Sequence, residues 1–377
     1  MLTPDVDLPG ALVSVDARLR LAKRLTAEFK SGNPIIVRGH GEELLASLDM
    51  MSRSTMEGFL EWTTGPLLIL LTAGRASTLV SCASIMPPEQ AVALRVCRTF
   101  SCLQYFSDFT RRLLPNELEG DARIVELPSS AASAIKLARN GHLIPTFALA
   151  SVTNARMLSA RERLLTIDIS EMLAACIDFE QTVTLCGAAH VPIDGCKDAR
   201  MFAFRSDFDG TEYLAVQIGD IDAATAPLVR LHSSCLTGDL LSSLRCDCGE
   251  QLRSSVSRII DEGCGILLYL PQEGRGIGLT NKIRAYHLQD EGADTVDANH
   301  LLGWEDDPRS YGAAASMLKT LGANRIRLLS NNPAKCQNLQ SLAITVVEMV
   351  PHAVTPTSFN AHYLATKRER CGHILPT

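Results

Sequence analysis

Three cysteines, Cys235, Cys246 and Cys248, are close together in the sequence, with ten residues between the first two and one between the last two. Thiolates are soft ligands that favour zinc, and three of them leave the fourth position of a tetrahedral ion for water, as in catalytic zinc sites. His232 is a candidate fourth ligand that would instead close the site. Three buried free cysteines are the alternative, because a C-x-C pair is a weaker signal than paired C-x-x-C motifs.

A glycine-rich turn follows a predicted buried strand over residues 265–270 and precedes a predicted helix. Gly274, Gly276 and Gly278 have no side chains, so backbone N–H groups can approach an anion there, and the start of the next helix adds its dipole. Arg275 within the turn adds a fork-shaped donor for phosphate. The order strand, turn, helix predicts a phosphate site, but not a Walker loop, because no GK[ST] sequence follows.

Two further junctions combine a capping residue, a proline and a cation. The Asp-Pro pair at residues 307–308 predicts the start of a helix, with Asp307 as N-cap and Arg309 in the first turn. The Asn-Pro pair at residues 332–333 repeats this pattern, with Lys335 in the first turn. Two strand-to-helix junctions that each present a cation suit a multiply charged nucleotide.

The composition is that of an ordinary globular protein with mild acidity. The chain has 377 residues, 46% of them hydrophobic, and a net charge of -6, which argues against a general nucleic-acid binder. Twelve cysteines over so long a chain do not indicate a disulfide scaffold. The amino-terminal residues lack the apolar core of a signal peptide, and no apolar run is long enough to span a membrane. We therefore expect a reducing, cytoplasmic setting.

The elements that must position these residues alternate between strands and helices in the first half of the chain. Periodicity predicts helices over residues 16–31, 41–62, 87–100, 129–141 and 169–179, and strands over 34–39, 66–72, 77–85 and 142–151. From about residue 181 the sequence pattern becomes typical of β-strands, with a hairpin turn predicted at Asp209-Gly210. The prediction is an α/β fold with α+β character in each half, in two domains, 1–185 and 186–377.

Residues from about 190 to 373 resemble GTP cyclohydrolase II, the first enzyme of riboflavin synthesis. The resemblance covers roughly half the chain and is dense. It rests on PLVRLHSSCLTGDLLSSLRCDCGEQL, GILLYLPQEGRGIGLTNKIRAYHLQDEGADTVDAN, LLSNNPAK and HYLATKRERCGHIL. It implies a zinc-containing fold with a mixed sheet and flanking helices.

The resemblance also implies a set of site residues. The zinc ligands of the family fall on Cys235, Cys246 and Cys248. Its catalytic tyrosine, aspartate and arginine fall on Tyr286, Asp307 and Arg309. Its GTP contacts fall on Arg230, Gln251, Glu273, Gly274, Arg275, Thr295, Ser330 and Lys335. Mg²⁺ is expected to accompany the triphosphate, and a homodimer is the expected assembly.

The resemblance implies that GTP is hydrolysed to 2,5-diamino-6-hydroxy-4-(5-phosphoribosylamino)pyrimidine, formate and pyrophosphate. Three thiolates weaken the acidification of a water by zinc, so a protein base or hydrogen-bond partner is expected to help. The family proposal makes the arginine a nucleophile on phosphorus, whereas a charged guanidinium has no free lone pair, so we expect Arg309 to clamp phosphate. Two positions depart from the family: Ser234 stands where a glutamate is usual and Ser330 where a threonine is common.

The first half resembles, more weakly, the dihydroxybutanone phosphate synthase domain that often precedes this enzyme. The likeness lies in the order of elements and in fragments such as GNPIIV and ARNGHLIP. The acidic metal-binding loop of that family would fall near RGHGEELLASLD, which has lost most of its carboxylates, and its RxGHTEA segment is absent. We therefore expect a degenerate, non-catalytic domain with a structural or dimerisation role.

Two alternatives to this function stay open at the level of the sequence. One is a zinc-stabilised GTP-binding regulatory protein that has lost turnover. The replacement of the usual glutamate by Ser234 would then be the first change toward that loss of activity. The other is a paralogue that opens the ring of GTP but retains the phosphates, or that serves another pathway. Retention of Tyr286, Asp307, Arg309 and all three cysteines argues against a mere binder.

Overall fold

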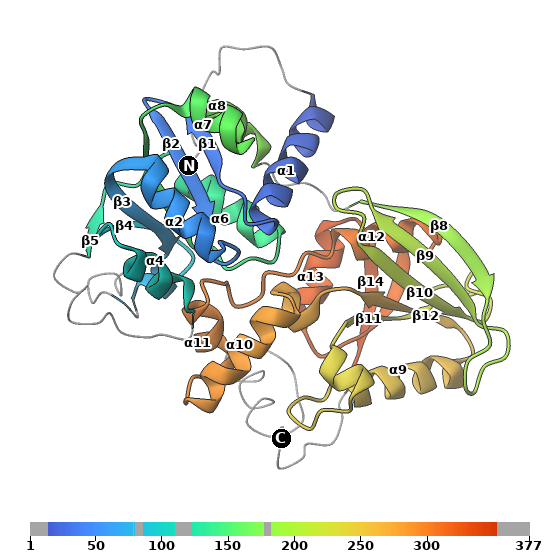
Figure 1. Ribbon diagram of the computed structural model, residues 1–377. Helices are drawn as coiled ribbons and strands as arrows, with labels where there is room; N and C mark the ends of the chain where they lie inside the picture. The colour runs from blue at the N-terminus through green and yellow to red at the C-terminus, as the bar shows by residue number, and fades with distance from the viewer. Residues whose placement is uncertain (1–13, 78, 80–85, 110–121, 177–181, 353–377) are drawn as a thin grey trace. The chain divides into compact units, whose positions relative to one another are not determined.

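The chain forms two compact units in the computed structural model (Figure 1). The residues described are 14–77, 79, 86–109, 122–176 and 182–352. The first unit comprises Met1–Phe179, Arg284–Glu291 and Asp297–Glu305, and the second comprises Glu180–Ile283, Gly292–Val296 and Asp306–Thr377. The chain thus leaves the first unit a few residues ahead of the predicted domain boundary, and two segments of its later half belong to the first unit rather than to the second.

The first unit is built on a seven-stranded sheet in the order β5-β4-β3-β6-β2-β1-β7. All neighbouring strands are antiparallel except the parallel pair of β1 and β7. The strands are β1 (Ile35–Arg38), β2 (Glu42–Ser47), β3 (Thr63–Thr72), β4 (Ala91–Val96), β5 (Arg123–Val125), β6 (Phe147–Val152) and β7 (Leu165–Asp168). The helices are α1 (Val15–Lys30), α2 (Arg53–Trp62), α3 (Ala73–Ala76), α4 (Phe100–Ser107), α6 (Ala131–Asn140), α7 (Ala155–Glu162) and α8 (Ile169–Ala175).

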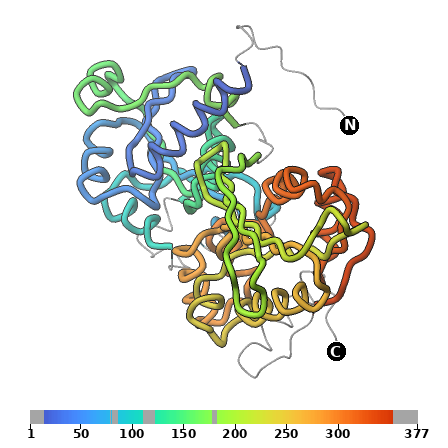
Figure 2. Tube along the Cα trace, turned by 90° about the vertical axis from the view of Figure 1, so that its right-hand side faces the viewer, coloured from blue at the N-terminus to red at the C-terminus, as the bar shows by residue number. Residues whose placement is uncertain are grey.

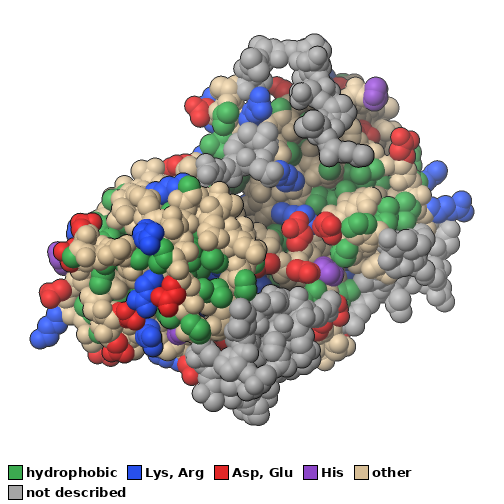
Figure 3. All heavy atoms as spheres, turned by 180° about the vertical axis from the view of Figure 1, so that it is seen from behind, with side chains coloured by type: hydrophobic (Ala, Val, Ile, Leu, Met, Phe, Trp, Pro, Cys, Tyr) green, Lys and Arg blue, Asp and Glu red, His purple; other side chains and the backbone are tan. Residues whose placement is uncertain are grey.

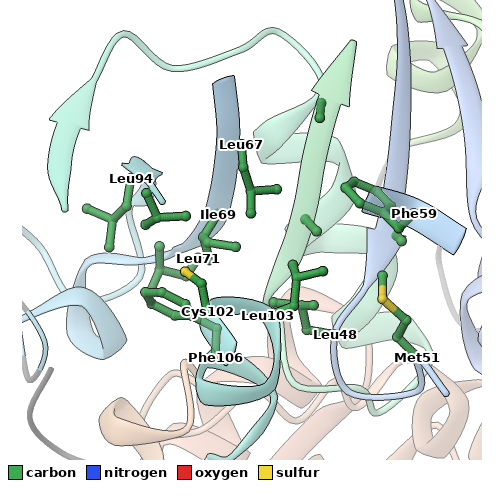
Figure 4. Packing of buried hydrophobic residues seen from close by; sticks show 14 of the residues in the cluster. Leu48, Met51, Phe59, Leu67, Ile69, Leu71, Leu94, Cys102, Leu103 and Phe106 are labelled. Carbon is green, nitrogen blue, oxygen red and sulfur yellow. The ribbon is translucent and has the colours of Figure 1, made fainter. Parts of the chain in front are cut away.

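Helices cover both faces of this sheet. On one face, Phe59 of α2 and Phe106 of α4 join a buried apolar cluster with Ile69 of β3 (Figure 4). On the other face, Phe29 of α1 packs edge-on against Phe147 of β6, with ring centroids 4.9 Å apart. Successive residues of a strand point to opposite faces, so alternate apolar positions of the same strands supply both layers.

Two of the helices expected in the first half are wrong. Residues 41–62 divide into strand β2 and helix α2, because the apolar run after Glu43 pairs with β1 and β6 and is buried on both sides. Residues 91–96 of the expected helix 87–100 form strand β4, which pairs antiparallel with β3. In both segments tertiary pairing outweighs local helical preference. Most of the strand expected over 77–85 lies outside the described residues, while the other helices and strands expected here are confirmed where described.

The second unit has a seven-stranded mixed sheet in the order β14-β13-β11-β12-β10-β9-β8. Strands β11, β12, β13 and β14 are mutually parallel, whereas β8, β9 and β10 are antiparallel and lie side by side in Figures 1 and 2. The strands are β8 (Val183–His190), β9 (Arg200–Ser206), β10 (Glu212–Ile218), β11 (Leu228–Ser233), β12 (Gly265–Leu270), β13 (Arg325–Leu329) and β14 (Thr345–Val350). The helices of the later half are η2 (Leu236–Leu240), α9 (Cys248–Glu262), η3 (Glu273–Gly276), α10 (Leu279–Asp290), α11 (Thr295–Leu301), α12 (Gly312–Thr320) and α13 (Pro333–Ser341).

This sheet is also covered on both faces, as the predicted mixed sheet with flanking helices requires. Met317 of α12 and Leu339 of α13 pack with Leu231 of β11 on one face, and Ile259 of α9 packs with Leu267 of β12 on the other. The predicted hairpin between β9 and β10 is confirmed, with Gly210 at a φ of 75°.

Charged side chains of both signs are interspersed over the face of the molecule drawn in Figure 3. Among the described residues, no helix combines the length and the apolar character needed to cross a membrane.

Candidate active site at the carboxyl edge of the second sheet

The site residues of the second unit gather where its parallel strands end. Strand β11 leads into Cys235, β12 leads into the glycine-rich turn, and β13 leads into Ser330. The carboxyl ends of parallel strands lie at one edge of a sheet, where open α/β proteins bind their ligands. The topology therefore brings together motifs that are far apart in the sequence.

The three cysteines form a tight cluster. Their sulfur atoms all lie within 4.8 Å of one another, and the sulfurs of Cys235 and Cys246 are 3.6 Å apart. Two thiolates that each lie about 2.3 Å from a tetrahedral zinc ion are about 3.8 Å apart, so this spacing suits zinc. A side chain at Gly238 would place its Cβ 2.8 Å from one of these sulfurs, so only glycine fits there, and its N–H donates to the sulfur of Cys235.

His232 does not join this cluster. Its Nε2 lies 3.0 Å from both carboxylate oxygens of Asp239, and burial lowers the pKa of the imidazole. The same carboxylate accepts hydrogen bonds from the backbone N–H of Cys235, at 2.9 Å, and from the hydroxyl of Tyr269, at 3.0 Å. The structure thus does not support His232 as a closing fourth ligand: Asp239 holds its ring and, through the backbone, also orients Cys235.

The glycine-rich turn has the strand–turn–helix context that the sequence predicts. Gly274 and Arg275 adopt left-handed backbone angles, with φ of 62° and 63°. Glu273, at the start of the turn, accepts a hydrogen bond from the backbone N–H of Leu236 at 2.7 Å and pairs with Lys282 at 2.7 Å. The turn is therefore tied to the segment that carries the first cysteine.

Arg230 lies in the middle of β11 and reaches helix α9. Its guanidinium donates to the side-chain oxygen of Gln251, at 2.6 Å, and to the carbonyl of Leu329, and burial lowers its pKa to about 10. The amide nitrogen of Gln251 in turn donates to Asp247, at 2.5 Å. Two of the predicted GTP contacts, Arg230 and Gln251, are thus in direct contact with each other.

His352 is a further buried group beside this pair. Its Nε2 lies 3.1 Å from the carbonyl oxygen of Gln251 and 3.3 Å from the hydroxyl of Ser254. Burial, assisted by the positive charge of Arg230, lowers the pKa of His352 from 6.5 to about 4. The folded protein therefore keeps this imidazole neutral at pH values where an unfolded chain would protonate it.

Stability should consequently fall in acid through His352. The unfolded state takes up a proton as the pH drops below 6.5, while the folded state does so only near 4, so the free energy of unfolding decreases across that window. Urea denaturation at pH 7, 5.5 and 4.5 should show a shallower decrease for His352→Gln than for the wild type. His190→Gln, at an exposed position of β8, is the control. Equal pH dependence of wild type and His352→Gln would contradict this assignment.

The helix start predicted at Asp307-Pro308 is wrong. Helix α12 begins only at Gly312. The Asp307 carboxylate accepts a hydrogen bond from the backbone N–H of Arg309, at 3.3 Å, and two from its guanidinium, at 2.6 and 2.5 Å, but no helix follows directly. Burial favours a higher pKa for Asp307, but these hydrogen bonds and the charge of Arg309 outweigh it, and the pKa is lowered. Arg309 is therefore a charged, bidentate partner of Asp307, and it does not lie in the first turn of a helix as predicted.

The second junction has the predicted form. Asn332 caps α13, whose first residue is Pro333, by accepting a hydrogen bond from the N–H of Ala334. Lys335 is buried and donates to the carbonyl of Leu231 in β11, at 3.2 Å. The hydroxyl of Ser330 accepts from the N–H of Asn332 at 3.1 Å. Ser330 and Lys335 therefore lie at the edge to which the cysteines also belong.

For two predicted site residues, Thr295 and Tyr286, the hydrogen bonds described above give no position within the site. Thr295 is the first residue of α11 and is half-buried. Tyr286 is half-buried in the part of α10 that belongs to the first unit. Their roles in the site stay predictions.

Sequence reasoning missed four residues of this site: Asp239, Asp247, Lys282 and Tyr311. Tyr311 is 4% exposed, with the guanidinium of Arg309 and the ammonium of Lys335 each 5.9 Å from its ring centroid. Its hydroxyl has no hydrogen-bond partner among the described residues, and burial raises its pKa to about 12. An aspartate between the cysteines or a lysine after the glycine-rich turn could have been singled out from the sequence, but nothing local marks Tyr311.

The second unit is thus an α/β structure whose sheet edge carries a three-thiol cluster bordered by buried cationic side chains. Residues 186–351 match the sequence model of the GTP cyclohydrolase II family. A protein of Azospirillum brasilense named GTP cyclohydrolase-2 is 36% identical over 97% of this chain and 97% of its own length. The chain belongs to the GTP cyclohydrolase II family and is an enzyme of that class.

Other similarities cover the chain less evenly. The riboflavin biosynthesis protein RibBA of Phocaeicola vulgatus is 40% identical over 68% of this chain and 65% of its own length. Among solved structures, RibBX, a two-domain 3,4-dihydroxy-2-butanone 4-phosphate synthase from A. baumannii, aligns over 89% of this chain and 99% of its own. That alignment has 14% identity and a TM-score of 0.32.

Proposed function

We propose that this protein hydrolyses GTP at the guanine imidazole ring, giving 2,5-diamino-6-hydroxy-4-(5-phosphoribosylamino)pyrimidine, formate and pyrophosphate in the first step of riboflavin biosynthesis. The observation that carries the proposal is the clustering of Cys235, Cys246 and Cys248 at the sheet edge that also bears Ser330 and Lys335. A hydrolytic metal site and a site for a triphosphate would thereby lie at the same edge of one sheet. The names of the related proteins agree with this activity.

Zinc is the ion that we propose for the thiol cluster. The sulfur spacing and the tight fit around Gly238 suit a small ion with soft ligands. The cluster contains three ligands among the described residues, and His232 is bound by Asp239 instead. Bound zinc would make water acidic enough to act as a nucleophile near neutral pH.

The protein side chains would bind and orient the triphosphate. Arg309 is held in a fixed plane by Asp307, so its outer edge is preorganised to clamp a phosphate group. Arg275 is close enough for its charge to contribute to the lowered pKa of Asp307. With Lys335, and with Mg²⁺ carried by the triphosphate, these cations would stabilise the pyrophosphate that leaves.

Simultaneous measurement of two products tests this function. The purified, zinc-loaded protein should release formate and pyrophosphate from GTP in equal amounts. Formate without pyrophosphate would favour the paralogue that retains the phosphates. Binding of GTP without either product would favour the regulatory protein and would overturn the proposal.

We propose that the first half of the chain is a degenerate dihydroxybutanone phosphate synthase-like domain without catalytic activity. The segment where metal-binding carboxylates would fall, residues 38–49, keeps only Glu42, Glu43 and Asp49, and Asp49 pairs with Arg284. Its centre is strand β2, where Leu44, Leu45 and Ala46 are buried in the core. Core aliphatic side chains cannot supply the oxygen ligands that a divalent cation needs. A structural or dimerising role is the function proposed for this half.

Ribulose 5-phosphate should therefore be left unchanged. The full-length protein, incubated with Mg²⁺ and ribulose 5-phosphate, is expected to form no dihydroxybutanone phosphate above the level of a protein-free control. Product formation detected by mass spectrometry would overturn the assignment of the first half.

A further inference from the structure

Lys282 is a buried cation in contact with Cys235, one of the proposed metal ligands. Its side chain is 9% exposed. Its ammonium donates to the sulfur of Cys235 at 3.0 Å, to the hydroxyl of Thr237 at 2.9 Å and to the carboxylate of Glu273 at 2.7 Å. A lysine is seldom buried without such partners, because desolvating the charge is costly. One side chain thus joins the cysteine segment to the glycine-rich turn.

The backbone of the glycine-rich turn holds Lys282 in this position. The N–H of Lys282 donates to the carbonyl of Gly278 in the first turn of α10. At Gly274, where φ is 62°, a side chain would place its Cβ 3.0 Å from the Cβ of Lys282. The turn therefore approaches the lysine closely because Gly274 lacks a side chain, and the glycines serve this contact as well as any phosphate.

An ammonium at the sulfur has a direct consequence for the metal centre. Three thiolates and one divalent cation carry a net charge of about -1, and strong donation from sulfur reduces the Lewis acidity of the ion. A hydrogen bond from Lys282 to Cys235 withdraws electron density from that sulfur and offsets the charge. Lys282 is thus a hydrogen-bond partner of the kind expected to help a three-thiolate hydrolytic site.

We propose that Lys282 is a positioning residue for the hydrolytic reaction, which tunes the metal centre through Cys235. The inference rests on the proposed function, because it assumes that the cysteines hold a metal. It goes beyond that function by assigning a role to a side chain outside the ligand set and the triphosphate contacts. Lys282 acts on the rate of the chemical step, whereas the binding of GTP depends on other side chains.

Cobalt substitution measures this role without reference to activity. The thiolate-to-cobalt charge-transfer band of the Co²⁺-loaded protein reports the electron density on sulfur. Lys282→Met removes the hydrogen bond and should shift the band to longer wavelength, Lys282→Gln should shift it less, and Lys282→Arg should leave it near the wild-type position. Lys319→Met, at an exposed position of α12, should not move it and serves as the control.

Kinetics of the zinc-loaded proteins give the second readout. For Lys282→Met, kcat should fall about 10- to 100-fold, the usual cost of losing a partner of a metal ligand, while KM for GTP changes less than about threefold. Lys282→Arg should recover most of the lost kcat. If Lys282→Met does not fold, as judged by its thermal transition, the comparison is made with the other two variants. The Gln variant should then show the larger band shift and the larger loss of kcat, and the Arg variant the smaller.

Three results would overturn the inference. An unmoved band and an unchanged kcat in Lys282→Met would mean that the contact with Cys235 has no influence. Equal losses in the Arg and Met variants would reduce Lys282 to a packing residue. A wild-type protein that takes up no Co²⁺ or Zn²⁺ would remove the metal site itself, which separates failure of the proposed function from failure of the role of Lys282.

Discussion

Cys246→Ser should lose its metal and release neither formate nor pyrophosphate from GTP at a measurable rate. Cys246 has its sulfur 3.6 Å from that of Cys235, so its loss leaves two thiolates, too few for tight binding. Bound zinc would lower the pKa of a water molecule, so loss of the ion removes the nucleophile. We expect the rate of formate release to fall at least about a thousandfold, with metal content measured by atomic absorption.

The matched control is Cys264→Ser, a half-buried cysteine of the same unit whose thiol donates to the carbonyl of Asp220. This variant should keep one zinc per chain and its full rate. If Cys246→Ser retained stoichiometric zinc, or lost zinc but kept the rate of formate release, the three-thiol site would not be the hydrolytic centre.

Arg309→Lys should slow the release of pyrophosphate without abolishing it. Arg309 donates two hydrogen bonds to Asp307 through Nε and Nη2, and a lysine keeps the charge but loses this bidentate geometry. Hydrogen bonds to charged groups contribute about 1.5–3 kcal/mol, which corresponds to a loss of about 10- to 100-fold. Rapid quench of a single turnover, with separate assays for the two products, gives the rate of each step.

Two comparison variants sharpen this test. Arg309→Ala removes the cation and should be slower than Arg309→Lys by at least another tenfold. Asp307→Asn keeps a hydrogen-bond acceptor but loses the charge that fixes the guanidinium, so it should resemble Arg309→Lys. Complete loss of pyrophosphate release in Arg309→Lys, with formate release intact, would argue for an arginine nucleophile instead of a clamp.

The elements that depend on local signals could be predicted from the sequence. Asn332-Pro333 begins α13 as expected, because the amide side chain is free to cap the helix. The same signal fails at Asp307-Pro308. The Asp307 carboxylate accepts from the backbone N–H of Arg309 and also binds its guanidinium, but the chain does not become helical before Gly312. Residues 42–47 likewise form a strand because two neighbouring strands pair with them, which no local pattern shows.

The site shows the same division between local and long-range information. The spacing of the three cysteines left a metal cluster and three buried thiols equally open, and only the fold brings their sulfurs within 4.8 Å of one another. Asp239 lies between these cysteines in the sequence, but its contact with Tyr269 bridges 30 residues. The contact between Lys282 and Cys235 spans 47 residues, so it follows from the topology of the sheet edge and not from any motif.

The most direct test of the central claim follows the fate of the imidazole carbon of the substrate. GTP labelled with ¹³C at the carbon between the two imidazole nitrogens is incubated with the zinc-loaded protein, and the reaction is followed by ¹³C NMR. The proposed function predicts that the label moves from the purine signal to free formate, and that a chelator which strips the zinc stops this transfer. A label that stays in the intact purine ring, with zinc bound, would contradict the account.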